Sequence, residues 1–439
     1  MRLFALNAGW MLLEKIFRVG AVFLITAWIA RTLGPEAFGK LNLYITIAAS
    51  AWIVAGMGMD VILLRDFSRG SGDQSTLLST AYVIRASILI IISIALIIYA
   101  AFFWPEGQSD EFRFGFIVVA MSIPFYNVNT YFPYYQATSS SRFVTFLSVG
   151  ALALSSLIKL AILLNDGGFI WMSVAVVSDV IVLSIAFAFI RAAGCPRLML
   201  SLFDPALAKS LLSQSAPLAI AAVLIVIYTR VDQFILEKMT HGNELGLYSV
   251  GVRVSEAFVF LPTLVSTSFF PMISNDLSRN NVRRYLDVVS GFSAVGVGVL
   301  CLLLPMAVPF LFGEQYAGSV SLSCVLLLGS FFAVSGGATT NYFVAKGMPY
   351  VRLIRSCVGI VLGVGLNLIW IPRYGAIGAA YAALVSQIAA GWLCNALTKS
   401  TRECFVIQTK SILTLGLVGL IAVCSDMLRS SRKRRDRIL

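Results

Sequence analysis

The chain has 439 residues, of which 59% are hydrophobic and 12% are charged. A soluble domain does not need that much apolar surface, and runs of about 20 apolar residues, enough to cross a bilayer, recur along the chain. The net charge of +12 would suit nucleic-acid binding, but the cations gather in short loops between apolar runs, as they do near anionic lipid. We therefore predict an all-α polytopic membrane protein and expect no nucleic-acid partner.

Hydropathy predicts about twelve spans joined by short loops. They cover residues 8–30, 39–64, 77–103, 114–136, 143–164, 168–190, 211–237, 246–273, 286–312, 319–345, 353–371 and 375–398. The first run lacks the small-residue cleavage site of a signal peptide, so we interpret it as a span. Residues 411–428 are also apolar, and two interpretations stay open for them: a thirteenth crossing, or a helix in the inner interface.

The loop charges predict the orientation of the spans. With the N-terminus inside, the inner loops hold most cations, among them Arg65, Arg283 and Arg355, whereas the outer loops hold mainly acids. The positive-inside rule then places the N-terminus in the cytoplasm. A thirteenth crossing would place the basic tail, residues 429–437, outside, which opposes this rule.

The longest loop separates six spans from six spans and predicts the domain organisation. We expect an N-terminal six-helix lobe, a cytoplasmic linker, a C-terminal six-helix lobe, and a hydrophobic segment with a basic tail, at residues 1–192, 193–209, 210–398 and 399–439. Short echoes, such as Leu33–Gly39 after the first span and His241–Gly246 after the seventh, indicate duplication of a six-helix unit. Such halves share one orientation and enclose a central cleft.

Charged residues inside the predicted spans are the main functional signal. A charge at bilayer depth costs about 2.5–3.5 kcal/mol, so it is usually paired or faces a cavity. Glu14 and Arg18 lie one helical turn apart in the first span, and Arg253 and Glu256 lie three residues apart in the eighth, so each pair can form an ion pair. Asp179 lies near the middle of the sixth span.

Two interpretations of these charges stay open. They are either self-paired charges that clamp helices together, or the lining of a water-filled cavity. In the second case the candidate ligands for an anionic group are Arg18, Arg253 and Arg230, because a guanidinium offers a fork of donors to phosphate. The candidate carboxylates for a coupling proton or sodium ion are Asp179, Glu256 and Asp232.

Other charged residues lie nearer to the span ends. We expect Asp60, Arg85 and Lys159 to reach toward the interface there, with their apolar stems in the membrane. The seven cysteines are scattered without a CxxC pair, and no cluster has metal-ligand spacing, so we predict neither a metal site nor a cofactor.

The end of the fourth span is rich in amide and aromatic side chains. Asn127, Asn129 and Tyr131 suit the hydroxyls and C–H faces of a sugar, and an aromatic belt at the interface is the equal alternative. Pro124 and Pro133 predict a bent helix.

Three stretches of this sequence resemble the polysaccharide-exporter family, which includes Wzx-type flippases of lipid-linked oligosaccharides. They are Ile29–Gly39, Val231-Asp232 followed by Gly246–Ser249, and Asn367–Ala380. The family belongs to the multidrug/oligosaccharidyl-lipid/polysaccharide exporter superfamily.

The resemblance implies two six-helix lobes, alternating access and ion coupling. It also implies the cargo, an undecaprenyl-diphosphate-linked oligosaccharide repeat unit of O-antigen, capsule or exopolysaccharide, moved from the inner to the outer leaflet of the bacterial inner membrane. A polymerase and a chain-length regulator are the partners that such a pathway implies.

Two rival functions are weighed against this one. A multidrug or cation antiporter of the same superfamily would favour acidic and aromatic cavity walls, whereas this chain places several cations in its spans. A membrane glycosyltransferase or polymerase would need a large outer loop or an acidic metal motif, and the one close acidic pair, Asp110-Glu111, lies in a short loop. We therefore predict a transporter and not an enzyme.

Overall fold

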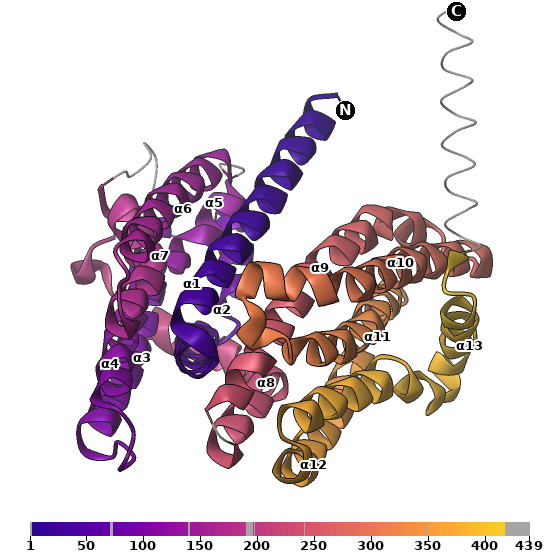
Figure 1. Cartoon of the computed structure of the whole chain (residues 1–439). Helices are drawn as coiled ribbons and strands as arrows, with labels where there is room; N and C mark the ends of the chain where they lie inside the picture. Colours follow the sequence, from indigo (N-terminus) through magenta and orange to yellow (C-terminus); the bar gives the residue numbers. More distant parts are fainter. Residues whose placement is uncertain are drawn as a thin grey trace, which may run out of the picture. The chain divides into compact units, whose positions relative to one another are not determined.

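The computed structural model describes residues 2–70, 73–138, 141–189, 196, 198–240, 242–348 and 350–417, with the side chains of residues 2–17 and a few others left out. All regular elements in these ranges are helices (Figure 1). Those that begin before residue 231 are α1 (Arg2–Gly56), α2 (Met59–Arg69), α3 (Gln74–Phe102), α4 (Asp110–Ser122), the 3₁₀ helix η1 (Ile123–Tyr131), α5 (Phe132–Ala137), α6 (Ser141–Leu164), α7 (Phe169–Phe189), η2 (Leu200–Leu202) and α8 (Pro205–Met239). The rest are α9 (Asn243–Asn275), α10 (Arg279–Phe312), η3 (Glu314–Tyr316), α11 (Ser319–Ala345), α12 (Tyr350–Gly391), η4 (Leu393–Ala396) and α13 (Lys399–Leu413).

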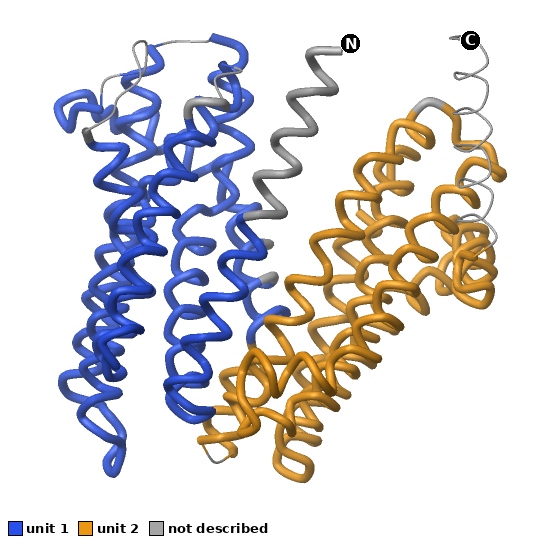
Figure 2. The backbone as a smooth tube through the Cα atoms, turned by 45° about the horizontal axis from the view of Figure 1, so that its top comes forward, with its two compact units in different colours: residues 1–230 blue, residues 231–439 orange. Residues whose placement is uncertain are grey.

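The chain forms two compact units, residues 1–230 and 231–439, which Figure 2 shows in different colours. Helix α8 crosses the boundary and contributes residues to both. Each unit is described separately below. The predicted lobes at residues 1–192 and 210–398 stay predictions.

Within the described residues, nine helices are long and apolar enough to cross a membrane. The prediction of an all-α polytopic fold is confirmed. Helix α1 contains the first predicted span and most of the second, and α12 contains the eleventh and most of the twelfth. The predicted span at 114–136 is divided among α4, η1 and α5. The count of twelve spans stays a prediction.

Glycines explain how two predicted spans run together in one helix. Gly34 in α1 has φ 80° and is followed by Pro35, which cannot donate a backbone hydrogen bond, so the helix kinks there. Gly375 kinks α12 with φ 60°. The amide that this second kink frees, that of Ala376, donates to Glu244 Oε2 at 2.7 Å. A short turn held by a side chain therefore replaces the predicted loop.

The fourth predicted span changes helix type at its prolines. Helix α4 ends at Ser122, and Pro124 lies in the first turn of η1. The N–H groups of a first turn have no acceptor within the helix, so a proline there costs no helical hydrogen bond. Pro133 stands at the start of α5 in the same way. The segment is thus an α–3₁₀–α succession rather than one straight helix.

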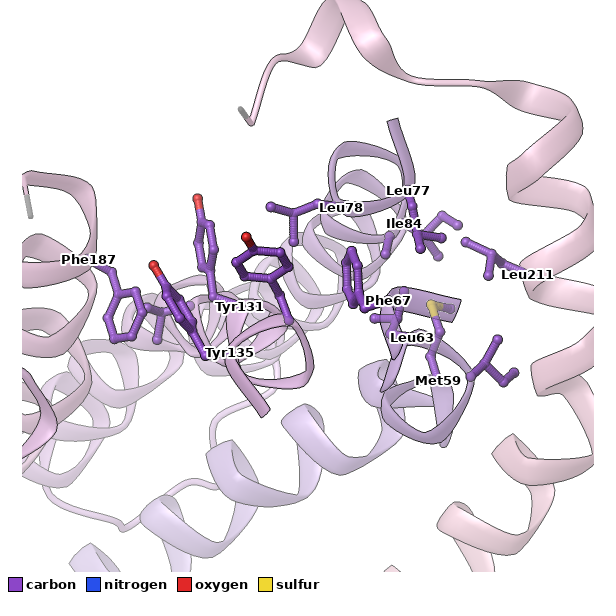
Figure 3. Close-up of a cluster of buried hydrophobic side chains, with 14 of the residues drawn as sticks. Met59, Leu63, Phe67, Leu77, Leu78, Ile84, Tyr131, Tyr135, Phe187 and Leu211 are labelled. Carbon is purple, nitrogen blue, oxygen red and sulfur yellow. The ribbon is translucent and has the colours of Figure 1, made fainter. Parts of the chain in front are cut away.

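Each unit has its own apolar core. In the first unit, Phe67, Tyr131, Tyr135 and Phe187 belong to a buried cluster that also includes residues of α2, α3 and α8 (Figure 3). In the second unit, Tyr285, Phe343 and Ile407 belong to a cluster formed by α9 to α13.

Candidate functional site

A buried ion pair lies beside a break in the second predicted span. Arg85 of α3 is 0% exposed, and its Nη2 donates to Asp60 Oδ1 at 2.7 Å. The guanidinium also donates to the Gly56 carbonyl and to Thr130 Oγ1, both at 3.4 Å, and lies 5.1 Å from the centre of the Trp52 ring. The prediction that Arg85 reaches to the interface is therefore wrong, because both of its Nη atoms have partners inside the unit.

The break itself explains why these partners are available. Met57 and Gly58 adopt left-handed conformations with φ 49° and 65°, which ends α1 at Gly56 and starts α2 at Met59. The ends of two helices therefore meet here, one with an unused carbonyl and the other with Asp60 in its first turn. A Cβ at Gly58 would lie 2.5 Å from Leu218 Cβ, so α8 packs directly on the break.

A second ion pair occupies the middle of α7. Asp179 accepts from Lys159 Nζ and from Ser155 Oγ of α6, both at 2.5 Å. Lys159 is buried, so its predicted reach to the interface is also wrong: its charge is satisfied by Asp179 within the unit. The Asp179 side chain is 41% exposed. The candidate coupling carboxylate is thus a paired group on an open surface of its unit.

The second unit contains two further candidate carboxylates. Arg253 Nη1 and Glu256 Oε2 of α9 are 3.4 Å apart, which confirms the predicted pair, and the Glu256 side chain is 41% exposed. Asp232 of α8 accepts from the Tyr248 hydroxyl of α9 and, through Oδ1, from the Gln233 amide at 2.8 Å. Both oxygens of Asp232 therefore accept hydrogen bonds within the second unit.

The structure does not bring the three candidate arginines together within one unit. Arg18 of α1 and Arg230 of α8 are half-buried in the first unit, and Arg253 belongs to the second. Their convergence on one cavity stays a prediction. The predicted pairing of Glu14 with Arg18 lies outside the described residues, as does His241.

The candidate sugar ligands Asn127, Asn129 and Tyr131 all have partners within the first unit. Asn127 is buried, its amide donates to the Tyr82 carbonyl at 3.1 Å, and its Oδ1 accepts from Thr130 at 2.9 Å. The Asn129 amide donates to the Tyr126 carbonyl at 2.9 Å. The geometry therefore does not support sugar contacts for these amides, because they already stabilise the 3₁₀ segment. Tyr131 stacks on Phe187 with ring centres 5.7 Å apart.

Sequence reasoning missed a buried arginine in the second unit. Arg355, predicted in an inner loop, lies in the second turn of α12 and is 7% exposed. Its Nε donates to the Ala390 carbonyl at 2.7 Å, its Nη2 to the Gly391 carbonyl at 3.4 Å, and its Nη1 to the hydroxyls of Thr339 and Thr340 at 3.0 and 3.1 Å. Arg355 thus caps the C-terminal end of its own helix, where the helix dipole favours a cation.

Helix α13 completes this polar cluster. Gln408 is buried and donates to the Gly391 carbonyl at 2.9 Å and to Ser335 Oγ at 3.0 Å. Cys404 on the same side of the helix is buried in the core, and this burial raises the pKa of its thiol to about 12. One signal of this cluster was present in the sequence, because Cys404, Ile407 and Gln408 follow helical spacing.

A turn interrupts the segment predicted at 411–428, directly after α13 ends at Leu413. Leu415 and Gly416 have positive φ values of 49° and 61°. A Cβ at Gly416 would lie 2.1 Å from the Asp287 carbonyl oxygen, so the turn lies directly on α10. The predicted helix therefore does not continue α13. Residues 418–428, which decide whether it crosses, lie outside the described residues.

The exposed carboxylates of Asp179 and Glu256 indicate the environment of the helix faces on which they lie. Asp179 is the central residue of α7 and Glu256 lies near the middle of α9, and both helices are apolar enough to span a membrane. A carboxylate exposed to hydrocarbon at that depth is strongly unfavourable. These faces are therefore suited to contact with water. Within the described residues, no group of three potential metal ligands lies close together.

The helices define an all-helical transporter fold. The solved structure of the lipid II flippase MurJ in an inward closed conformation matches it with a TM-score of 0.70 at 17% identity, over 97% of this chain and 99% of that one. An inward-facing multidrug resistance MATE family transporter of the MOP superfamily matches with a TM-score of 0.72 at 14% identity, over 91% and 95% of the two chains.

Residues 4–276 match the family described as polysaccharide biosynthesis protein, and the chain belongs to that family. It is also 27% identical over 396 residues to the probable flippase AglR of Haloferax volcanii, which covers 84% of this chain and 77% of that protein. The resemblance read from the sequence is confirmed at the level of the polysaccharide exporters and their superfamily. The chain is a multi-pass membrane protein of the transporter class.

Proposed function

We propose that this protein is a flippase for undecaprenyl-diphosphate-linked oligosaccharide repeat units of O-antigen, capsule or exopolysaccharide. It moves them from the inner to the outer leaflet of a bacterial inner membrane by alternating access of two six-helix lobes. Its N-terminus lies in the cytoplasm. The observation that carries the proposal is the set of charged side chains on open faces of apolar helices, of which Asp179 and Glu256 are each 41% exposed. The similarity to AglR, described as a probable flippase, and to MurJ, described as a lipid II flippase, supports the proposal independently.

The chemistry of the cargo explains why such faces are needed. A diphosphate and a sugar chain lose their water at great cost when they enter hydrocarbon. A hydrated path for the headgroup removes this barrier, and the polyprenyl chain remains in lipid. Arg18, Arg230 and Arg253 supply guanidinium donors for the diphosphate in this proposal, and Tyr131 supplies a ring and a hydroxyl for sugar.

The paired carboxylates supply the coupling to an ion gradient. A proton or sodium ion that binds Asp179 competes with Lys159, because the ammonium already contacts one carboxylate oxygen at 2.5 Å. Glu256 lies 3.4 Å from Arg253. In this proposal Arg253 contacts the cargo and Asp179 binds the ion, with Glu256 and Asp232 as further candidate carboxylates.

The proposal is tested by substitution in cells that display the glycan. Arg18→Ala and Arg253→Ala are each expected to abolish surface glycan while the protein level in the membrane is unchanged. Arg65→Ala is the matched control, because Arg65 is an exposed cation paired with Asp66 at 2.7 Å outside the candidate spans. Normal surface glycan in both variants would refute the role of these arginines.

The fold is equally similar to a multidrug transporter, so a drug or cation antiporter is the second candidate. A purified flippase moves lipid-linked sugar between leaflets and leaves a cationic dye untouched, whereas an antiporter does the reverse. The same assay separates a glycosyltransferase or polymerase, which would lengthen the sugar. A polymerase and a chain-length regulator acting on the flipped product are the partners of the proposed pathway.

A further inference from the structure

Three buried polar side chains of α10 and α13 have no hydrogen-bond partner among the described residues. The atoms concerned are Asp287 Oδ1 and Ser290 Oγ on α10 and Ser411 Oγ on α13. These residues are 3%, 1% and 0% exposed. Helices α10 and α13 contact each other within the second unit (Figure 1). Because a buried polar atom without a partner is costly, such atoms usually face a ligand or an ordered water.

The local fold brings these oxygens to one place. Ser290 follows Asp287 by three residues, so both lie on one face of α10. The Ser411 hydroxyl lies next to the Asp287 carboxylate, yet neither this hydroxyl nor Oδ1 has the geometry of a hydrogen bond. Oxygens that lie close together without bonding one another are the arrangement that a shared cation requires.

The turn after α13 closes the site. A Cβ at Gly416 would lie 2.1 Å from the Asp287 carbonyl oxygen and 2.3 Å from the Gly291 amide nitrogen, so the turn lies on the same stretch of α10 that carries the carboxylate. The oxygens are thus enclosed between α10, α13 and this turn. An ion bound there would connect all three.

The charges around the site favour a cation. The Arg283 Nε lies 3.7 Å from Asp287 Oδ2, and the Arg283 side chain is 45% exposed, so this contact leaves Oδ1 without a counter-ion of its own. Ser411 lies in the last turn of α13, where the helix dipole also favours positive charge. Lys410, the basic residue of that turn, is exposed to solvent. It therefore leaves the buried side of the helix unoccupied.

The ligand types indicate which cation fits. Carboxylate and hydroxyl oxygens suit hard metal cations rather than soft ones. A single carboxylate balances one positive charge, and a divalent ion would leave a further charge buried at high cost. Among the residues that the structure describes, no three potential ligands of the histidine, cysteine or acidic type gather in one place. The oxygens at Asp287 therefore fit a monovalent metal cation.

We propose that Asp287, Ser290 and Ser411 bind one monovalent metal cation, Na⁺ or K⁺, which fastens α13 and the turn after it to α10. The site includes none of the candidate coupling carboxylates. It lies within the second unit and does not depend on the identity of the cargo.

The test is thermal unfolding of the purified full-length protein in NaCl, KCl or N-methyl-D-glucamine chloride at equal ionic strength. An ion at a hundred times its Kd raises the ratio of folded to unfolded protein about a hundredfold. For a unit of residues 231–439 this effect corresponds to a rise in Tm of roughly 5–11 °C. The salt that gives the larger rise identifies the ion. An equal Tm in the three salts would show that the site holds water only and would overturn the proposal.

Two variants and a matched control locate the effect. Asp287→Asn keeps the shape of the side chain and removes its charge, so the salt-specific rise in Tm is expected to disappear. Ser411→Ala removes one ligand and is expected to move the midpoint of the rise to at least about tenfold higher ion concentration. Glu403→Gln removes an exposed acid from the same helix and should keep the full rise. An unchanged rise in Asp287→Asn would assign the ion to another site and overturn the proposal.

A second measurement uses the unsubstituted protein, so it does not depend on the folding of a variant. Cys404 is buried on α13 about two turns before Ser411, and Cys357 is exposed on α12. If the ion fastens α13 to α10, alkylation of Cys404 relative to Cys357 should be several-fold slower in the favoured salt than in N-methyl-D-glucamine chloride. Equal relative rates would refute the fastening of α13. Neither readout measures transport, so their failure leaves the test of glycan transport unaffected.

Discussion

The ion pair between Asp60 and Arg85 predicts an asymmetric response to mutation. Arg85 is 0% exposed and the Asp60 side chain is 53% exposed. Asp60→Ala leaves a buried guanidinium without its carboxylate, which typically costs about 3–5 kcal/mol. Arg85→Met leaves a carboxylate that water can reach, and its main cost is the lost hydrogen bonds to Gly56 and Thr130, about 1–3 kcal/mol. Asp60→Ala should therefore destabilise the protein more than Arg85→Met.

The assay is thermal unfolding of the detergent-purified protein, followed by size-exclusion of a fluorescently tagged chain. For a unit of 230 residues, a loss of 3–5 kcal/mol corresponds to a fall in Tm of roughly 6–20 °C. The double variant Asp60→Ala/Arg85→Met should be more stable than Asp60→Ala alone, because it no longer buries an unpaired charge. A melting temperature for Asp60→Ala at or above that of Arg85→Met would refute this reasoning.

Three further predictions concern single positions. Gly416→Ala should destabilise the second unit by at least about 1 kcal/mol, because the residue has φ 61° and an added Cβ would lie 2.1 Å from the Asp287 carbonyl oxygen. Thermal unfolding measures this loss of stability, and an unchanged Tm would contradict the described turn. Arg355→Met should speed alkylation of buried Cys404 relative to exposed Cys357, because the Ala390 carbonyl loses the Arg355 donor and the Gly391 carbonyl keeps only that of Gln408. Equal relative rates would exclude Arg355 as the cap. Hydrogen bonds from Thr76 and Ser75 lower the pKa of Asp73 below its ordinary value, so its stabilisation of α3 is complete above the unfolded pKa and is lost as the pH falls through the folded pKa. Asp73→Asn should keep the cap and weaken this acid dependence of the Tm, and an unaltered dependence would show that other groups cause it.

The all-helical class and the apolar character of the long helices could be read from the sequence, because hydropathy depends on local composition. The elements that join them were harder to read. Gly375 and Gly34 replace loops by kinks, and the first of these depends on Glu244, more than a hundred residues away in the chain. The bend near Pro124 was predictable, because a missing N–H is a local property of the residue.

The environment of charged residues could be predicted only where both partners lie on one helix. Arg253 and Glu256 are three residues apart, so their pairing followed from helical geometry. Arg85 and Lys159 were placed by their depth in a span, whereas their burial depends on Asp60 and Asp179, which lie in other helices. Arg355 was missed for the same reason, since its partners lie in α11 and at the far end of α12 and become its neighbours only in the folded unit.

The central claim is tested most directly by transport in proteoliposomes. The purified protein is reconstituted with a fluorescent undecaprenyl-diphosphate oligosaccharide, and its appearance on the opposite leaflet is measured with an impermeant quencher. We predict translocation well above protein-free liposomes, and loss of this activity in Arg253→Ala but not in Arg65→Ala. Translocation by the wild type no faster than in empty liposomes, together with exchange of a cationic dye for protons, would contradict the proposed function.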